Sequence, residues 1–204
     1  SDTDVMVKNV AGQKLVLDGT TEAITLTANM ADTQTSANLV SQNAGNTVNF
    51  SLTGKALTDV NLVTDGANAD TISGTDTIKN VNVTATGDAE VTLENMNKLE
   101  NVTVAGAGAV DLTVVDSVKT VDASANAGGV TVNLSRADEA AFTGGAGKDS
   151  ITVSGSKAAH DLGAGDDTLT FSGALGEKGT VEGGEGTDTI SVTAANLTAL
   201  AAEF

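Results

Sequence analysis

The fold of this chain is decided by the segment Gly144-Gly145-Ala146-Gly147-Lys148-Asp149-Ser150-Ile151-Thr152. It fits the nonapeptide G-G-x-G-x-D-x-U-x, in which U is a large apolar residue. Residues 183–191 repeat the pattern, and residues 162–170 depart from it only at Leu162, which stands in place of the first glycine. The nonapeptide is the sequence signature of a calcium-binding parallel β-solenoid.

The glycines and the aspartate of the nonapeptide have different tasks. Glycine lets the backbone adopt left-handed angles, so that successive carbonyl groups can turn toward an ion. Ca²⁺ takes about six to eight oxygen ligands from carboxylates and carbonyls. Because one loop cannot supply that many oxygens, an ion must lie between two loops.

The spacing of the aspartates predicts which loops share an ion. Asp149 and Asp167 are 18 residues apart, and Asp167 and Asp188 are 21 apart. Eighteen residues make two nonapeptides, which is one turn of a solenoid. Stacked carboxylates about 4.8 Å apart repel by roughly 3 kcal/mol at an effective dielectric constant of about 20. We therefore predict two Ca²⁺ ions, one between the first and second loops and one between the second and third.

The same repeat continues toward the N-terminus. Glycines recur at intervals of 18 to 21 residues, and apolar residues usually follow four and six places later; these glycines are Gly45, Gly66, Gly87, Gly108, Gly128, Gly147, Gly165 and Gly186. Alternation with period two predicts strands with one buried face, and a repeat of this length predicts stacked coils. We predict an all-β, right-handed parallel β-solenoid of about eight turns of 18–21 residues.

The repeat also suggests four segments. Residues 1–40 form a β segment in irregular register, and residues 41–138 form turns largely without metal. Residues 139–192 form the calcium-binding turns, and residues 193–204 form a C-terminal cap or a continuation.

Composition narrows the function classes. The net charge is −17, which disfavours nucleic acid and anionic membranes as partners, since both require clustered Lys and Arg. No stretch is long and apolar enough for membrane insertion. The chain has no Cys, so no disulfide stabilises it. It has no Trp or Tyr and a single Arg, which argues against an enzyme such as a polysaccharide lyase.

Isolated polar residues have ordinary explanations. His160 is the only histidine and has no patterned partners, so we expect no catalytic role for it. Asp70 is better explained as a turn residue and Asp166 as a solvated neighbour of Asp167. The sequence leaves open whether either contacts a metal.

The three nonapeptides resemble the repeats-in-toxin (RTX) family, proteins of Gram-negative bacteria exported by type I secretion. This resemblance covers residues 144 to 191. The acidic, Cys-free, aromatic-poor remainder is similar to RTX-containing surface-layer (S-layer) proteins, which form two-dimensional coats on the cell surface in a calcium-driven assembly. The resemblance implies an extracellular structural protein that associates with other copies in a lattice, with any polysaccharide anchor in regions outside this chain.

The resemblance also implies a set of ligands. Carboxylates would come from Asp149, Asp167 and Asp188. Carbonyl groups would come from the glycine-rich loops, at Gly144, Gly145, Ala146, Gly147, Gly163, Ala164, Gly165, Gly183, Gly184, Glu185 and Gly186. The half-turns at 153–161 and 171–182 lack the G-x-G-x-D core, so we expect ions along one edge only.

Two alternatives remain at this point. The chain could be the stalk of an RTX adhesin or exoprotein, or a calcium-triggered folding module for type I secretion. Ice binding by rows of Thr is a further, minor option.

Overall fold

The computed structural model describes residues 3–18, 22–43, 47–66, 69–137, 139–155, 157–173 and 179–192. Within these ranges the chain forms strands joined by turns, and no helix. Strands are expected here because Val and Thr alternate along the repeats and no proline removes a donor from the ladders. The predicted C-terminal segment 193–204 lies outside the described residues.

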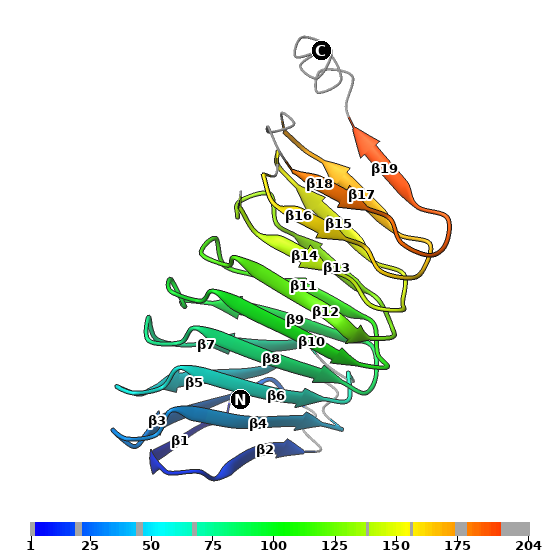
Figure 1. Ribbon diagram of the computed structural model, residues 1–204. Coiled ribbons are helices and arrows are strands. Elements are labelled where there is room, and N and C mark those ends of the chain that lie inside the picture. The colour runs from blue at the N-terminus through cyan, green and yellow to red at the C-terminus, as the bar shows by residue number, and fades with distance from the viewer. Residues whose placement is uncertain are drawn as a thin grey trace.

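The strands make two parallel sheets, and successive strands of the chain alternate between them (Figure 1). The ten-stranded sheet contains β1 (Thr3–Val10), β3 (Ile24–Met30), β5 (Val48–Thr53), β7 (Ala69–Ser73), β9 (Ala89–Glu94), β11 (Val110–Thr113), β13 (Val130–Asn133), β15 (Ser150–Val153), β17 (Thr168–Phe171) and β19 (Thr189–Val192). The nine-stranded sheet contains β2 (Lys14–Asp18), β4 (Ser36–Gln42), β6 (Asp59–Thr64), β8 (Asn80–Ala85), β10 (Asn101–Gly106), β12 (Thr120–Asn126), β14 (Ala141–Thr143), β16 (Ala159–Asp161) and β18 (Thr180–Glu182).

This arrangement confirms the predicted all-β parallel solenoid. Each coil adds one strand to each sheet, so strands that pair are one coil apart in the sequence. In the C-terminal part, Ser150 of β15 pairs with Thr168 of β17, a separation of 18 residues. The right-handed sense stays a prediction.

The N-terminal strands belong to the same ladder as the rest. Strands β1 to β4 join the two sheets in parallel register, although the coils from β2 to β4 and from β3 to β5 are longer than the repeat. Ile24 pairs with Val48, a separation of 24 residues, and β1 is shifted in register between Lys8 and Val10. The longer coils explain why residues 1–40 look irregular against a repeat of 18–21. The division into four segments stays a prediction, since the same sheets run across the boundaries at 40 and 138.

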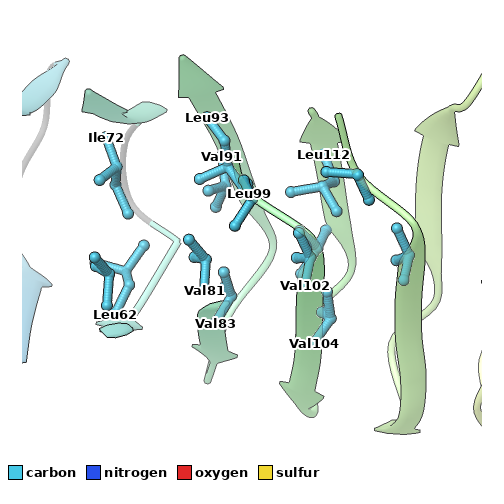
Figure 2. Close-up of a cluster of buried hydrophobic side chains, with 14 of the residues drawn as sticks. Leu62, Ile72, Val81, Val83, Val91, Leu93, Leu99, Val102, Val104 and Leu112 are labelled. Atoms are coloured by element: carbon cyan, nitrogen blue, oxygen red, sulfur yellow. The ribbon is translucent and has the colours of Figure 1, made fainter. Parts of the chain in front are cut away.

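The core is a narrow space between the two sheets, filled by columns of aliphatic side chains (Figure 2). In the nine-stranded sheet Val81, Val102 and Val121 occupy successive coils of one column and are buried. Each fully buried Val or Leu contributes about 1.5–3 kcal/mol relative to exposure. Because every coil repeats the column, the core extends along the solenoid axis.

Stacked glycines run along one edge of the core. A Cβ atom on Gly108 would lie 1.9 Å from the carbonyl oxygen of Gly87, and one on Gly186 would lie 1.9 Å from that of Gly165. Only glycine fits at such a close approach between coils. The structure therefore confirms the predicted stacking of repeat glycines from Gly66 onward; Gly45 lies outside the described residues.

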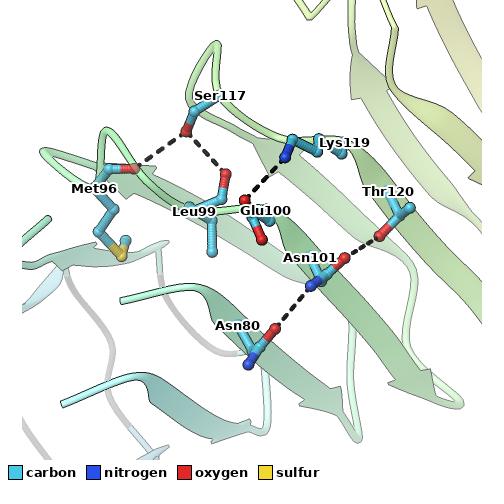
Figure 3. Close-up of polar contacts among 8 residues, drawn as sticks. All are labelled: Asn80, Met96, Leu99, Glu100, Asn101, Ser117, Lys119 and Thr120. Carbon is cyan, nitrogen blue, oxygen red and sulfur yellow. Dashed lines mark hydrogen bonds and ion pairs between the residues drawn. The ribbon is translucent and has the colours of Figure 1, made fainter. Parts of the chain in front are cut away.

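The outer face of the nine-stranded sheet carries a polar ladder that fixes the register of the coils (Figure 3). Asn101 Nδ2 donates to Asn80 Oδ1 at 2.8 Å, and Thr120 Oγ1 donates to Asn101 Oδ1 at 2.8 Å. The neighbouring ion pair of Lys119 with Glu100 (2.9 Å) is exposed and contributes about 1 kcal/mol or less.

Candidate metal centre

The three motif aspartates stack in one column at the glycine edge. Each directly precedes a strand of the ten-stranded sheet, namely β15, β17 or β19. Their following residues Ser150, Thr168 and Thr189 pair in register. The structure thus brings together the three loops that the sequence predicted to be neighbours.

Each carboxylate is tied to the coil before it by a backbone hydrogen bond. Asp149 Oδ1 accepts from the Val130 amide at 2.6 Å. Asp167 Oδ1 accepts from the Asp149 amide at 2.7 Å, and Asp188 Oδ1 accepts from the Asp167 amide at 3.1 Å. One oxygen of each carboxylate therefore positions the side chain, which leaves the other oxygen, Oδ2, as the atom to ligate a cation.

The second oxygens differ between the loops. Asp149 Oδ2 accepts from the Gly145 amide at 3.2 Å. Asp167 Oδ2 is buried and has no hydrogen-bond partner in the part of the chain that the structure describes. A buried carboxylate oxygen without a partner carries a desolvation penalty of about 1–3 kcal/mol or more, and a bound cation would remove that penalty.

Burial raises the pKa of two of these carboxyl groups. Asp149 and Asp167 are each 1% exposed. Burial is the main cause that brings the pKa of Asp149 to about 6; the hydrogen bonds from Val130 and Gly145 oppose it, and the charge of Asp167 adds to it. The pKa of Asp167 is likewise raised by burial and by the charges of Asp188 and Asp166, while its hydrogen bond from Asp149 and the ammonium of Lys148 oppose this. The ionised form of the column is therefore unfavourable by itself, and either a proton or a cation would neutralise it.

The glycines of the loops form a cradle around the carboxylates. A Cβ atom on Gly144 would lie 2.4 Å from Asp149 Oδ2, and one on Gly183 would lie 2.4 Å from Asp188 Oδ2. Gly184 has φ +88°, in the left-handed region that favours glycine. At the corresponding start of the middle loop, Leu162 places its side chain in the core.

The backbone of the three loops forms further rungs between the coils. Ala164 donates to the Gly145 carbonyl at 2.8 Å, and Glu185 donates to the Gly163 carbonyl at 2.9 Å. These carbonyl groups each keep one lone pair. Among the described residues no three His, Cys, Asp or Glu side chains gather around a common point. An ion here would consequently need carbonyl ligands beside the aspartates, and the full predicted ligand set stays a prediction.

The two secondary aspartates are placed differently. Asp70 pairs between Val48 and Val91, in a core column, and is buried. The interpretation of Asp70 as a turn residue is wrong, and its position does not correspond to that of Asp149. Asp166 is exposed, as expected, and its Oδ1 accepts from the Thr187 amide at 2.9 Å.

Asn126 is a residue at this edge that the sequence did not single out. Its buried side chain lies one coil before the first aspartate loop, where the Asn126 carbonyl accepts from Ala146. Asn126 Oδ1 accepts from Gly128 (3.1 Å) and Gly129 (2.7 Å), and Nδ2 donates to the Gly108 carbonyl (2.9 Å). The side-chain amide of Asn126 thus supplies hydrogen-bond partners for the backbone of this glycine turn, a role that needs no metal. Its only signal in the sequence is its place two residues before a repeat glycine.

No family model matches this chain, and no curated protein or solved structure matches it either. In the part of the chain that the structure describes, no helix is long and apolar enough to cross a membrane.

The geometry of the fold and of the site defines a structural class. It is a parallel β-solenoid whose last coils carry a buried column of carboxylates at a glycine edge.

Proposed function

We propose that this chain is a calcium-stabilised solenoid segment of an RTX-type bacterial surface-layer protein. The observation that carries the proposal is the column of Asp149, Asp167 and Asp188 at the glycine edge, with two of the three side chains buried. A stack of carboxylates in such a place is unfavourable by itself, and a divalent cation turns the repulsion into attraction.

The chemistry of the loops suits Ca²⁺. Its ligands would be oxygens only, a carboxylate and carbonyls from two neighbouring loops, and Ca²⁺ accepts such flexible oxygen sets. Extracellular calcium modules commonly bind at about 10⁻⁴ to 10⁻³ M, so calcium outside a cell would fill sites of this kind. Asp167, between the other two carboxylates, would face both predicted ions.

Exposed apolar side chains outside the loops support self-association. Among the described residues, the exposed large apolar side chains lie mostly on strands at the ends of the two sheets; they are Val5, Met6, Val16 and Ile190, with Val63 as the exception. An end strand of a parallel sheet can pair with a further coil or with another molecule. We assign no catalytic activity to the chain.

Electron microscopy with and without calcium tests the proposal. We expect the full chain to form two-dimensional ordered sheets in millimolar calcium and to disperse in EDTA. Filaments or monomers that respond to calcium would instead favour the stalk or secretion-module alternative. A calorimetric titration gives an independent result, because the absence of calcium binding would refute the metal site whatever the assembly looks like.

A further inference from the structure

His160, for which the sequence predicted no catalytic role, lies in the hydrophobic core. It occupies the middle of β16 and pairs with Phe142 of β14 and Val181 of β18. Phe142 in turn pairs with Val121, so the imidazole continues a column of apolar residues. The side chain is 2% exposed.

The imidazole has no polar partner among the described residues. Neither Nδ1 nor Nε2 of His160 makes a hydrogen bond to them, although both atoms are buried. A neutral imidazole carries one donor and one acceptor, and leaving each unsatisfied costs about 1–3 kcal/mol. A protonated imidazole in the same place would be still less favourable, because a buried charge requires a partner.

No charged group faces His160 from the strands around it. Strands β14, β15 and β17 contain no titratable side chain. Asp161 on β16 and Glu182 on β18 are exposed, in line with the alternation of the strands. The nearest buried acids in the sequence, Asp149 and Asp167, precede β15 and β17 at the glycine edge. Burial alone lowers the pKa of His160.

The strands that hold His160 are the shortest of their sheet. β14, β16 and β18 have three residues each, whereas β6, β8 and β10 have six. Fewer paired residues give fewer ladder hydrogen bonds, so these coils should open more readily than the middle of the solenoid.

We propose that His160 is a proton-triggered latch: the last coils stay closed while the imidazole is neutral, and uptake of a proton opens them. Protonation requires the side chain to leave the core, and β14, β16 and β18 must separate for it to do so. The solenoid upstream has no equivalent group, since His160 is the only histidine. The latch is a property of the fold and does not depend on calcium binding.

Hydrogen exchange of the full chain in EDTA tests the latch. Wild type is compared with His160→Leu, which restores an apolar column, and with His160→Gln, which keeps a polar side chain that cannot titrate. One proton taken up on opening changes the opening equilibrium by up to about tenfold per pH unit below about pH 6.5. For residues 141–182, we therefore expect the opening constant of wild type divided by that of either variant to rise by up to about tenfold for each pH unit of acidification.

The ratio of opening constants is the proper readout because Asp149 and Asp167 also titrate in all three proteins. Their raised pKa values make acidification favour the closed coils, which is opposite to the effect expected of His160. Equal pH dependence in wild type and both variants would overturn the latch, as would an equal loss of protection at residues 80–126. A second measurement needs no variant. The single imidazole gives an unambiguous NMR titration, and an imidazole that protonates near pH 6.5 while residues 141–182 stay protected would also refute the proposal.

Discussion

The middle of the solenoid and its C-terminal coils use the same position in opposite ways. In the middle, the first residue of the strand at the glycine edge is apolar: Ala89, Val110 and Val130 succeed one another in register and are buried. In the next two coils the column continues with Asp149 and Asp167, which are as buried as the valines.

The comparison separates two ways of stabilising one backbone path. A buried Val stabilises its coil under all conditions, because the gain is removal of apolar surface from water. A buried Asp stabilises its coil only if a cation or a proton neutralises it. At this position the middle of the solenoid thus has side chains whose contribution does not depend on pH or calcium, and the C-terminal coils have side chains whose contribution does.

The largest effect is expected when the column of carboxylates is extended by one coil, into the part of the solenoid where this position is apolar. Val130→Asp would bury a charge beside Asp149, and we expect a loss of about 3–5 kcal/mol in the free energy of unfolding without calcium. Denaturant unfolding in EDTA measures it. Val130→Thr is the matched control, since it keeps the shape of the side chain and replaces one methyl group by an uncharged hydroxyl. Losses of equal size would mean that the charge is not what separates the two regions.

Removing calcium should destabilise the C-terminal coils more than the middle of the solenoid. If the sites are about a hundredfold saturated, the metal stabilises the folded coils by about 2.7 kcal/mol. Hydrogen exchange with excess calcium and with EDTA should therefore show a larger loss of protection at residues 144–192 than at residues 45–135. Unchanged protection in both parts would refute calcium binding, and an equal loss in both would refute a boundary.

Much of this contrast was predictable from the sequence. The recurring glycines and the alternating apolar residues predict the coils, because stacked turns with a narrow core require both features at a fixed interval. For the same reason, the spacing of Asp149 and Asp167 predicts that the two residues lie next to each other in successive coils. The backbone hydrogen bonds of the carboxylates were not predictable, since they depend on where each loop lies against the coil before it.

Polar residues inside the core were the main failure of the sequence-based reasoning. Asp70 precedes Ile72 by two residues, as Asp149 precedes Ile151, and this similarity suggested a loop position. Counted from its repeat glycine, however, Asp70 comes four places after Gly66, where Ile151 comes four places after Gly147. In the structure, Asp70 takes the place that counting from Gly66 predicts, and it lies in the core column. Stacking of the glycines, rather than local motif similarity, therefore sets the register.

Within the aspartate column, the central residue should matter most. Asp167→Ala removes the carboxylate that lies between two others and has the unpartnered oxygen. We expect it to weaken calcium binding at both predicted sites, whereas Asp149→Ala and Asp188→Ala each affect one. Calcium titration of the three variants measures this, and equal losses would show that the ions do not lie between successive loops.

The pH dependence of the calcium-free protein gives the most specific effect. The pKa of Asp149 is raised from 3.8 to about 6, so between these values the folded state holds a proton that the unfolded state has lost. The stability contributed by this protonation is complete below pH about 3.8 and is lost as the pH rises through about 6. Relative to Asp149→Asn, wild type should gain up to about 1.4 kcal/mol per pH unit on acidification across this window.

Excess calcium should reverse the sign of this difference. A bound metal requires the ionised carboxylate, so acidification then displaces the ion and destabilises wild type relative to Asp149→Asn. The measurement is the urea midpoint of both proteins across the window, once in EDTA and once in calcium. A difference between the two proteins with the same sign in both conditions would show that Asp149 does not ligate the ion. A reversal would establish that one buried carboxylate exchanges a proton for a metal, which is the property that Val130, in the equivalent place one coil earlier, lacks.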